Sequence, residues 1–116
     1  MDKRVIGKYG ERLACEFLKK KGYKIIDNNY RTRVGEIDII ARDRESLVFI
    51  EVKTRTDIEA GYPEQNITSA KLQNFKAASQ IYILDNNITL PFHLDVISVD
   101  LSKSRPDIVH FKNITL

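Results

Sequence analysis

Residues 35–55 read GEIDIIARDRESLVFIEVKTR, and the rest of the chain is organised around them. Two apolar runs, 36–42 and 47–53, flank the polar tetrad 43–46. Apolar runs of this length that are joined by a short turn predict a β-hairpin. A two-residue loop and a four-residue loop give the same register of the two strands, so the register is predicted without knowing the turn.

In this register Asp38 lies opposite Glu51, and the alternation of side chains along a strand places Lys53 on the same face. Opposed residues have Cβ atoms about 4.5–5.5 Å apart, and like charges at that distance destabilise a sheet. A divalent cation between the carboxylates would offset the repulsion, because Mg²⁺ typically binds one or two carboxylates together with water and phosphate oxygens. A solvated hairpin face with a Glu51–Lys53 ion pair accounts for the same spacing, so both interpretations stay open.

The composition is that of one soluble globular domain. The chain has 116 residues, of which 42% are hydrophobic and 30% charged, so we expect a single domain over residues 1–116. Its apolar runs are strand-sized and its N-terminus lacks the apolar segment of a signal peptide, so we expect no transmembrane helix and no secretion. A single cysteine excludes an intramolecular disulfide and a Cys-based metal site, and the expected location is the cytoplasm.

The net charge of +3 is unevenly distributed. Residues 1–34 carry ten Lys and Arg against four Asp and Glu, so this first third has a charge of +6 and the remainder a charge of −3. A basic surface that leads into an acidic pocket suits a protein that binds phosphate backbones near a metal ion. A solvated basic helix end gives the same composition, so charge alone does not decide between them.

Hydrophobic periodicity predicts the elements on either side of the hairpin. They are a helix over 5–21, a strand over 23–30, a helix over 69–84 and strands over 92–100 and 108–115. Gly22 is expected to end the first helix, and Thr68 or Ser69 to cap the second. The polar segment 54–66 is expected to be a functional or mobile loop because of its length.

Ionisable residues outside the hairpin are candidates for the same site. Glu11 lies at the flank of the apolar stripe of the first helix, where it either leans over the sheet or pairs with a neighbouring cation. Lys71 lies on the buried face of the second helix and either extends to solvent or points at a substrate phosphate. Arg31, Arg33 and Arg55 are candidates for phosphate contacts, because arginine binds phosphates in a bidentate manner.

The remaining polar residues and motifs of the chain narrow the choice of function. Asp95, His93 and His110 are isolated in predicted strands, and a surface position or a satisfied edge position explains them better than metal ligation. The chain has no Gly-rich phosphate loop, no nucleophile elbow and no His-Glu-x-x-His motif. The sequence therefore gives no support to a nucleotide hydrolase, a serine hydrolase or a zinc protease.

Taken together, the motifs resemble the YraN family, small bacterial proteins related to the PD-(D/E)xK nucleases and especially to archaeal-type Holliday junction resolvases. The resemblance covers nearly the whole chain and is most specific at Gly35-Glu-Ile-Asp38-Ile-Ile-Ala41 and Leu47-Val-Phe-Ile-Glu51-Val-Lys53-x-Arg55. The weaker matches are Gly7-x-x-Gly10-Glu11, Gly22-Tyr23, Asn29-Tyr-Arg31, Ile67 with Lys71, and Leu94-Asp95-Val-Ile97.

The resemblance implies an α/β fold, namely a restriction-endonuclease-like αβββαβ core with a mixed β-sheet flanked by helices. It also implies catalytic roles for Glu11, Asp38, Glu51 and Lys53. Asp38 and Glu51 would hold Mg²⁺ or Mn²⁺, helped by the backbone carbonyl of Val52 and by Glu11 as a direct or outer-sphere ligand. Lys53 would position the attacking water and stabilise charge in the transition state.

The function expected from these features is a Mg²⁺-dependent endonuclease that acts on DNA, with branched or junction DNA among the candidate substrates. The alternative is a non-catalytic module with a nuclease fold that binds nucleic acid or a partner protein. Three acids and a lysine together favour the enzyme, because a pure binding module needs no clustered acids facing a polyanion. The sequence leaves open the substrate structure, the number of metal ions and whether the chain forms a homodimer.

Overall fold

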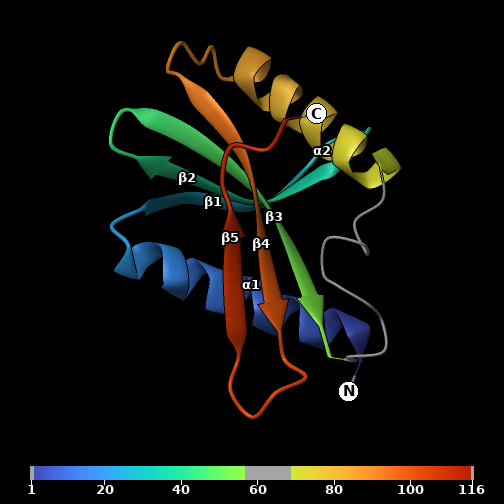
Figure 1. The fold of residues 1–116 in the computed structure, drawn as a ribbon. Helices are drawn as coiled ribbons and strands as arrows, with labels where there is room; N and C mark the ends of the chain where they lie inside the picture. The colour runs from blue at the N-terminus through green and yellow to red at the C-terminus, as the bar shows by residue number, and fades with distance from the viewer. Residues whose placement is uncertain (1, 57–68, 116) are drawn as a thin grey trace.

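The computed structural model describes residues 2–56 and 69–115 of the chain. In chain order its elements are α1 (Lys3–Lys20), β1 (Lys24–Arg31), β2 (Glu36–Asp43), β3 (Ser46–Arg55), α2 (Ser69–Asp85), β4 (Phe92–Asp100) and β5 (Asp107–Phe111) (Figure 1). The predicted order of a helix, three strands, a second helix and two further strands is confirmed.

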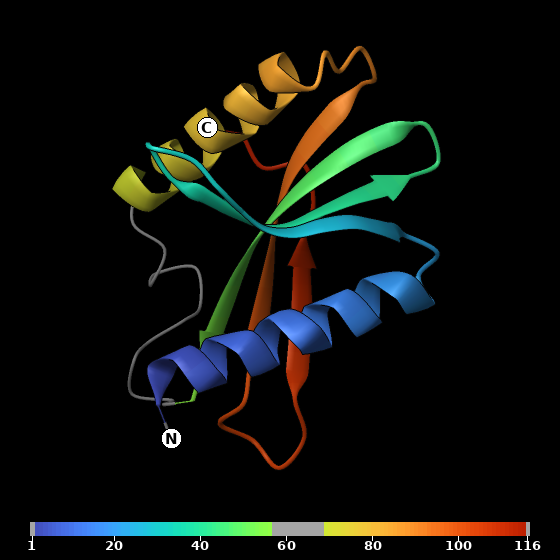
Figure 2. The ribbon, with the colours of Figure 1, turned by 180° about the vertical axis from the view of Figure 1, so that it is seen from behind.

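The strands form one five-stranded sheet in the spatial order β1-β2-β3-β4-β5. β3 and β4 are parallel and the other neighbouring strands are antiparallel, which confirms the predicted mixed sheet. The sheet is strongly twisted, so that β1 and β2 run across the direction of β4 and β5, and β3 follows β2 in its first half and β4 in its second (Figure 2). α1 and α2 pack on opposite faces of this sheet.

The central strand β3 is buried on both faces, because its side chains alternate between two hydrophobic clusters. Val48 and Ile50 pack in the cluster beneath α1. Leu47 and Phe49 pack in the cluster beneath α2. Burial on both faces explains the nearly continuous apolar run in this strand, and the alternation places the charged Glu51 on the α2 side.

Two local signals set the ends of α1. It begins earlier than predicted because Asp2 caps it, with its side chain accepting a hydrogen bond of 2.8 Å from the backbone N–H of the second helical residue. It ends at Lys20, one residue before the predicted end, and Gly22 provides the predicted stop: its φ is 94°, and the N–H groups of Gly22 and Tyr23 donate to the carbonyls of Lys19 and Leu18, each at 3.0 Å. These bonds form a Schellman motif.

The end of β3 differs from the prediction. β3 continues to Arg55, so residues 54–55 belong to the strand and not to the predicted loop. The remainder of that loop from residue 57, and the candidate cap Thr68, lie outside the described residues. Across residues 2–56 and 69–115, neither helix is long and apolar enough to cross a membrane.

The end of the last strand also differs. β5 stops at Phe111, whereas the sequence pattern predicted a strand to residue 115. The chain turns at Asn113, which has a φ of 53°. Ile114 then packs into the α2 cluster, and its N–H donates to the carbonyl of Leu94 at 2.8 Å. Burial of this one apolar side chain on the α2 side explains why the tail leaves the sheet.

Candidate metal-dependent active site

The register predicted for the β2–β3 hairpin is confirmed. The pairs run from Asp43 with Ser46, at the two-residue turn, to Ile39 with Ile50. Arg44 in the turn has a φ of 57°, which provides the positive φ that tight hairpin turns need. The next position along this ladder is that of Asp38 and Glu51.

At this position the two strands separate. Within the described chain, the β2–β3 pairing ends at Ile39 and Ile50, and beyond it β2 leads toward α2 while β3 leads toward the N-terminus of α1 (Figure 2). An unbroken ladder would use the Val52 N–H for the next bond to β2. That N–H donates instead to Oδ2 of Asp38 at 2.8 Å. The Asp38 side chain therefore occupies the fork between the strands.

Asp38 and Glu51 meet in this fork, as predicted. Each is only 5% exposed, and their carboxyl groups are hydrogen-bonded to each other. Burial, and then the adjacent Asp38 carboxylate, raise the pKa of Glu51 to about 9. With its pKa raised in this way, Glu51 keeps its proton at neutral pH in the metal-free protein, which neutralises one charge of the pair.

Two lysines approach the pair from different elements. Lys53, two residues along β3 from Glu51, lies in the same pocket. Its pKa is lowered, chiefly by burial and then by the nearby Lys71. Lys71 in the first turn of α2 has its Nζ 3.8 Å from Oε1 of Glu51. Lys71 therefore borders the pocket, in a contact with Glu51 that was not foreseen, and the phosphate contact considered for it stays a prediction.

Glu11 reaches the same pocket from α1. Its pKa is raised by burial and then by Asp38, and its side chain is hydrogen-bonded to Asn29. The close approach of α1 depends on Gly10, because a Cβ atom at that position would overlap the side chain of Thr54 in β3. Of the two interpretations of Glu11, the structure supports the one in which it leans over the sheet.

The pocket that contains these groups has a volume of about 610 Å³. Its walls are the N-terminal halves of α1 and α2, and its floor is the fork of β2 and β3. Helix N-termini carry partial positive charge and favour anions. Cations line the pocket as well, namely Lys3, Lys53, Arg55 and Lys71. Lys3 was missed in the sequence, where nothing distinguished it from the other basic residues of the first helix.

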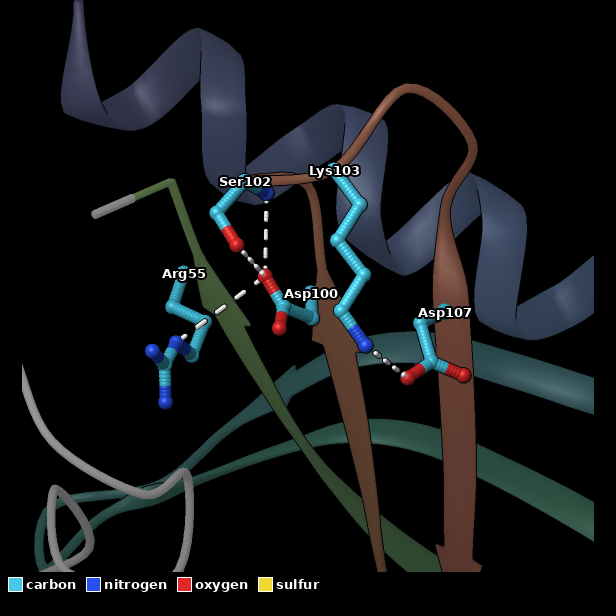
Figure 3. A network of polar contacts seen from close by, with 5 residues as sticks. All are labelled: Arg55, Asp100, Ser102, Lys103 and Asp107. Atoms are coloured by element: carbon cyan, nitrogen blue, oxygen red, sulfur yellow. Dashed lines mark hydrogen bonds and ion pairs between the residues drawn. The ribbon is translucent and has the colours of Figure 1, made fainter. Parts of the chain in front are cut away.

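Arg55 lines the pocket but is anchored within the fold. It is 8% exposed, and its Nε lies 3.9 Å from Oδ1 of Asp100 on the neighbouring strand (Figure 3). The same oxygen accepts hydrogen bonds from the N–H and Oγ of Ser102 at 2.9 and 2.6 Å, which hold the pKa of Asp100 below its usual value. The contact to phosphate predicted for Arg55 stays a prediction.

Arg31 and Arg33 lie outside this pocket. They line a neighbouring hollow formed by the β1–β2 connection, and Gly35 and Glu36 border both hollows. Arg31 forms an exposed ion pair with Glu36, with a distance of 3.5 Å between Nε and Oε2. These arginines are thus placed at the rim, and the structure does not bring them to the carboxylates.

Asp95 corrects the prediction of a surface or edge position because it is buried in β4, whereas His110 lies on the edge strand β5 and is satisfied there by Asp95, as predicted. They form a buried pair, with 2.8 Å between Oδ2 and Nε2 and with both side chains 3% exposed. The other Asp95 oxygen accepts the N–H of Asn113 at 2.8 Å. The pair ties β5 and the following turn to β4. Sequence reasoning missed it because the two residues belong to separate strands.

The arrangement fits a metal ion held by two carboxylates. In the described parts of the chain, no three His, Cys, Asp or Glu side chains are placed to ligate one metal ion. Glu11 borders the same pocket, and its role as a direct or outer-sphere ligand stays a prediction. Two carboxylates with water and phosphate are sufficient for Mg²⁺, and a cation would replace the shared proton.

Comparison with known proteins shows related chains of the same length. The family model described as "Uncharacterised protein family UPF0102" matches residues 10–99. The chain is 41% identical over 118 residues to a UPF0102 protein of Carboxydothermus hydrogenoformans, covering 98% of each chain. It is 44% identical over 111 residues to a UPF0102 protein of Alkaliphilus oremlandii, covering 93% of this chain and 95% of the relative.

Proposed function

The chain belongs to the uncharacterised protein family UPF0102, and we propose that it is a divalent-metal-dependent endonuclease that acts on DNA, with branched or junction DNA as a candidate substrate. One observation carries this proposal. Asp38 and Glu51 are buried together in the fork of the hairpin, beside a partly buried lysine and in a pocket lined by cations. Two adjacent buried carboxylates require a neutralising proton or cation.

The residues of the fork have separate roles in this proposal. Asp38 and Glu51 hold Mg²⁺ or Mn²⁺, together with the Val52 carbonyl. The bound metal supplies Lewis-acid chemistry, polarising a phosphoryl oxygen and lowering the pKa of water. Lys53 orients the attacking water and stabilises the charge that develops on the phosphoryl group. Burial of Lys53 supports this role, because a desolvated cation interacts more strongly with that charge.

The cations of the pocket support a nucleic acid as the substrate. Lys71 and Arg55 are proposed to contact phosphates within the pocket, and Arg31 and Arg33 to contact phosphates at its rim. Phosphate contacts position a nucleic acid without reading its sequence, which suits recognition of DNA structure. The cytoplasmic location expected from the sequence belongs to the same proposal.

One contact favours the alternative, a nuclease fold that binds nucleic acid or a partner without cutting. The Lys71–Glu51 ion pair provides counter-charge to Glu51 from within the protein. In a non-catalytic module this lysine would stabilise the carboxylates permanently. In the enzyme, Lys71 would release Glu51 when metal and phosphate bind. The two functions therefore differ in whether divalent metal ions change the protein.

Cleavage assays test the proposal directly. Linear, flapped and four-way DNA are incubated with Mg²⁺ or Mn²⁺ and either the wild type or Asp38→Ala. We expect metal-dependent cutting by the wild type and none by the variant. Asp43→Ala is the matched control, because it removes an aspartate from the other end of the same strand. Failure of the wild type to cut any DNA with either metal would leave the binding module as the function.

A further inference from the structure

Asn29 has a left-handed backbone conformation inside a strand. Its φ is 53°, although it lies within β1. Non-glycine residues rarely adopt positive φ, and asparagine is one of the few that tolerate it. Asn87 and Asn113 have similar φ values, of 50° and 53°, but both lie in turns outside the helices and strands. The conformation of Asn29 therefore requires an explanation from its surroundings.

The strained residue lies opposite Asp38. Asn28 pairs with Ile39 and Tyr30 pairs with Ile37, so the position between them sets Asn29 across from Asp38. At this point the side chains of both β1 and β2 change the face of the sheet to which they point. In β2, Ile39 packs in the α1 cluster while Ile37 packs in the α2 cluster.

In β1 the change of face is equally clear. Asn28 reaches α1, where its Nδ2 lies 3.3 Å from Sγ of Cys15. Tyr30 instead packs edge-to-face against Tyr82 of α2, with ring centroids 5.0 Å apart. Regular alternation would put residues two apart on one face. The left-handed residue between them breaks the alternation and allows two consecutive asparagines to face α1.

This reversal brings the Asn29 side chain to Glu11. The two side chains are hydrogen-bonded, and Glu11 lines the pocket with Asp38 and Glu51. We propose that Asn29 is a positioning residue, which orients the Glu11 carboxylate toward the Asp38–Glu51 pair. This inference rests on the proposed function, because it treats the three carboxylates as one metal-binding region. Asn29 itself acts only through Glu11.

Substitution by glycine separates the role of the Asn29 side chain from that of its backbone conformation. A glycine at this position would keep the positive φ without strain, so that only the side chain would be lost. If Asn29 merely accommodates the backbone, Asn29→Gly should equal or exceed the wild type in every measurement. If Asn29 positions Glu11, the variant should stay folded and respond less to metal.

The test is the Mn²⁺ dependence of the melting temperature, which needs no DNA and no cleavage. The proteins are the wild type, Asn29→Gly, Glu11→Gln and the double variant. We expect Asn29→Gly to weaken the apparent Mn²⁺ affinity about tenfold, as the loss of outer-shell partners does. The double variant should bind no more weakly than Glu11→Gln alone. Asn87→Gly makes the same change at the same φ in the turn after α2, and it should match the wild type.

An Asn29→Gly protein with wild-type Mn²⁺ affinity overturns the positioning role, and so does a double variant whose two losses multiply. Neither result touches the proposed function, which depends on cleavage by the wild type. If the wild type does not respond to Mn²⁺, the metal site fails. The same four proteins are then unfolded in urea without metal. If the changes in the free energy of unfolding of the two single variants do not add up to that of the double variant, the positioning of Glu11 is supported. If they are additive, it is overturned.

Discussion

Glu51 is the residue whose protonation should dominate the pH dependence of stability. Its pKa in the folded protein is about 9, against an ordinary value of 4.5. Between these values the folded protein holds a proton that the unfolded chain has lost, so stability falls as pH rises. One proton corresponds to a slope of at most about 1.4 kcal/mol per pH unit. This fall in stability with rising pH is expected of the metal-free protein.

Urea unfolding in EDTA at several values between about pH 5 and pH 8 measures that slope. We expect Glu51→Gln to remove most of it, because the amide cannot ionise. Glu45→Gln is the matched control, since Glu45 is exposed in the hairpin turn. A wild-type protein whose stability is flat over this range would contradict a shared proton in the fork.

Asp38 should control the response to metal. Mg²⁺ or Mn²⁺ should raise the melting temperature in proportion to RT ln(1 + [M]/Kd), which reaches about 2.7 kcal/mol at a hundredfold excess over Kd. Asp38→Asn should abolish this dependence, because it removes one of the two carboxylates proposed to hold the ion. Thermal melts with and without millimolar metal provide the comparison. If Asp38→Asn retains the wild-type shift, the ion binds elsewhere.

At the scale of elements, the site depends on how closely α1 approaches β3. The helix carries Glu11, and Gly10 is the point of contact. A Cβ atom at Gly10 would lie 2.8 Å from Cβ of Thr54 and would overlap the Thr54 hydroxyl, whereas one at Gly7 would have no atom within 4 Å. Substitution by alanine should therefore have opposite effects on stability at these two glycines of the same helix.

Gly10→Ala should lower the melting temperature and weaken the metal response, because it pushes α1 and Glu11 away from the fork. Gly7→Ala should stabilise the protein by about 0.5–1 kcal/mol through helix propensity alone. Thermal melts of both variants, with and without Mn²⁺, decide the point. Equal stabilisation by both substitutions would mean that the contact with Thr54 does not limit the approach of the helix.

At the scale of the whole molecule, binding and chemistry should separate onto different residues. Arg33 lies at the rim and Lys53 in the pocket. Arg33→Ala should weaken binding to all DNA sequences alike and lower the salt slope by about one unit. Lys53→Ala should leave affinity within a few-fold but lower the cleavage rate by about a hundredfold or more.

Salt titrations of DNA binding and single-turnover cleavage measure the two effects side by side. Arg44→Ala, an exposed arginine at the far end of the hairpin, is the control for general charge loss. Equal losses of affinity in Arg33→Ala and Lys53→Ala, with no cleavage by the wild type, would support the binding module.

Much of the fold and of the site was determined by the sequence alone. Local patterns were sufficient for the order of elements, the hairpin register and the meeting of Asp38 with Glu51, because a short loop and a period of two leave little choice. Gly22 ended α1 for a similarly local reason. Membership of the family followed from the same motifs.

The tertiary structure decided what depends on residues distant in the chain. Packing between elements produces the separation of β2 and β3, the contacts of Lys71 and Arg55 with acids on other elements, and the burial of Asp95 with His110. The left-handed Asn29 and the reversed faces around it likewise have no local pattern in the sequence. The physical reason is that desolvation and charge pairing depend on three-dimensional proximity, whereas periodicity reports only which face of its own element a residue occupies.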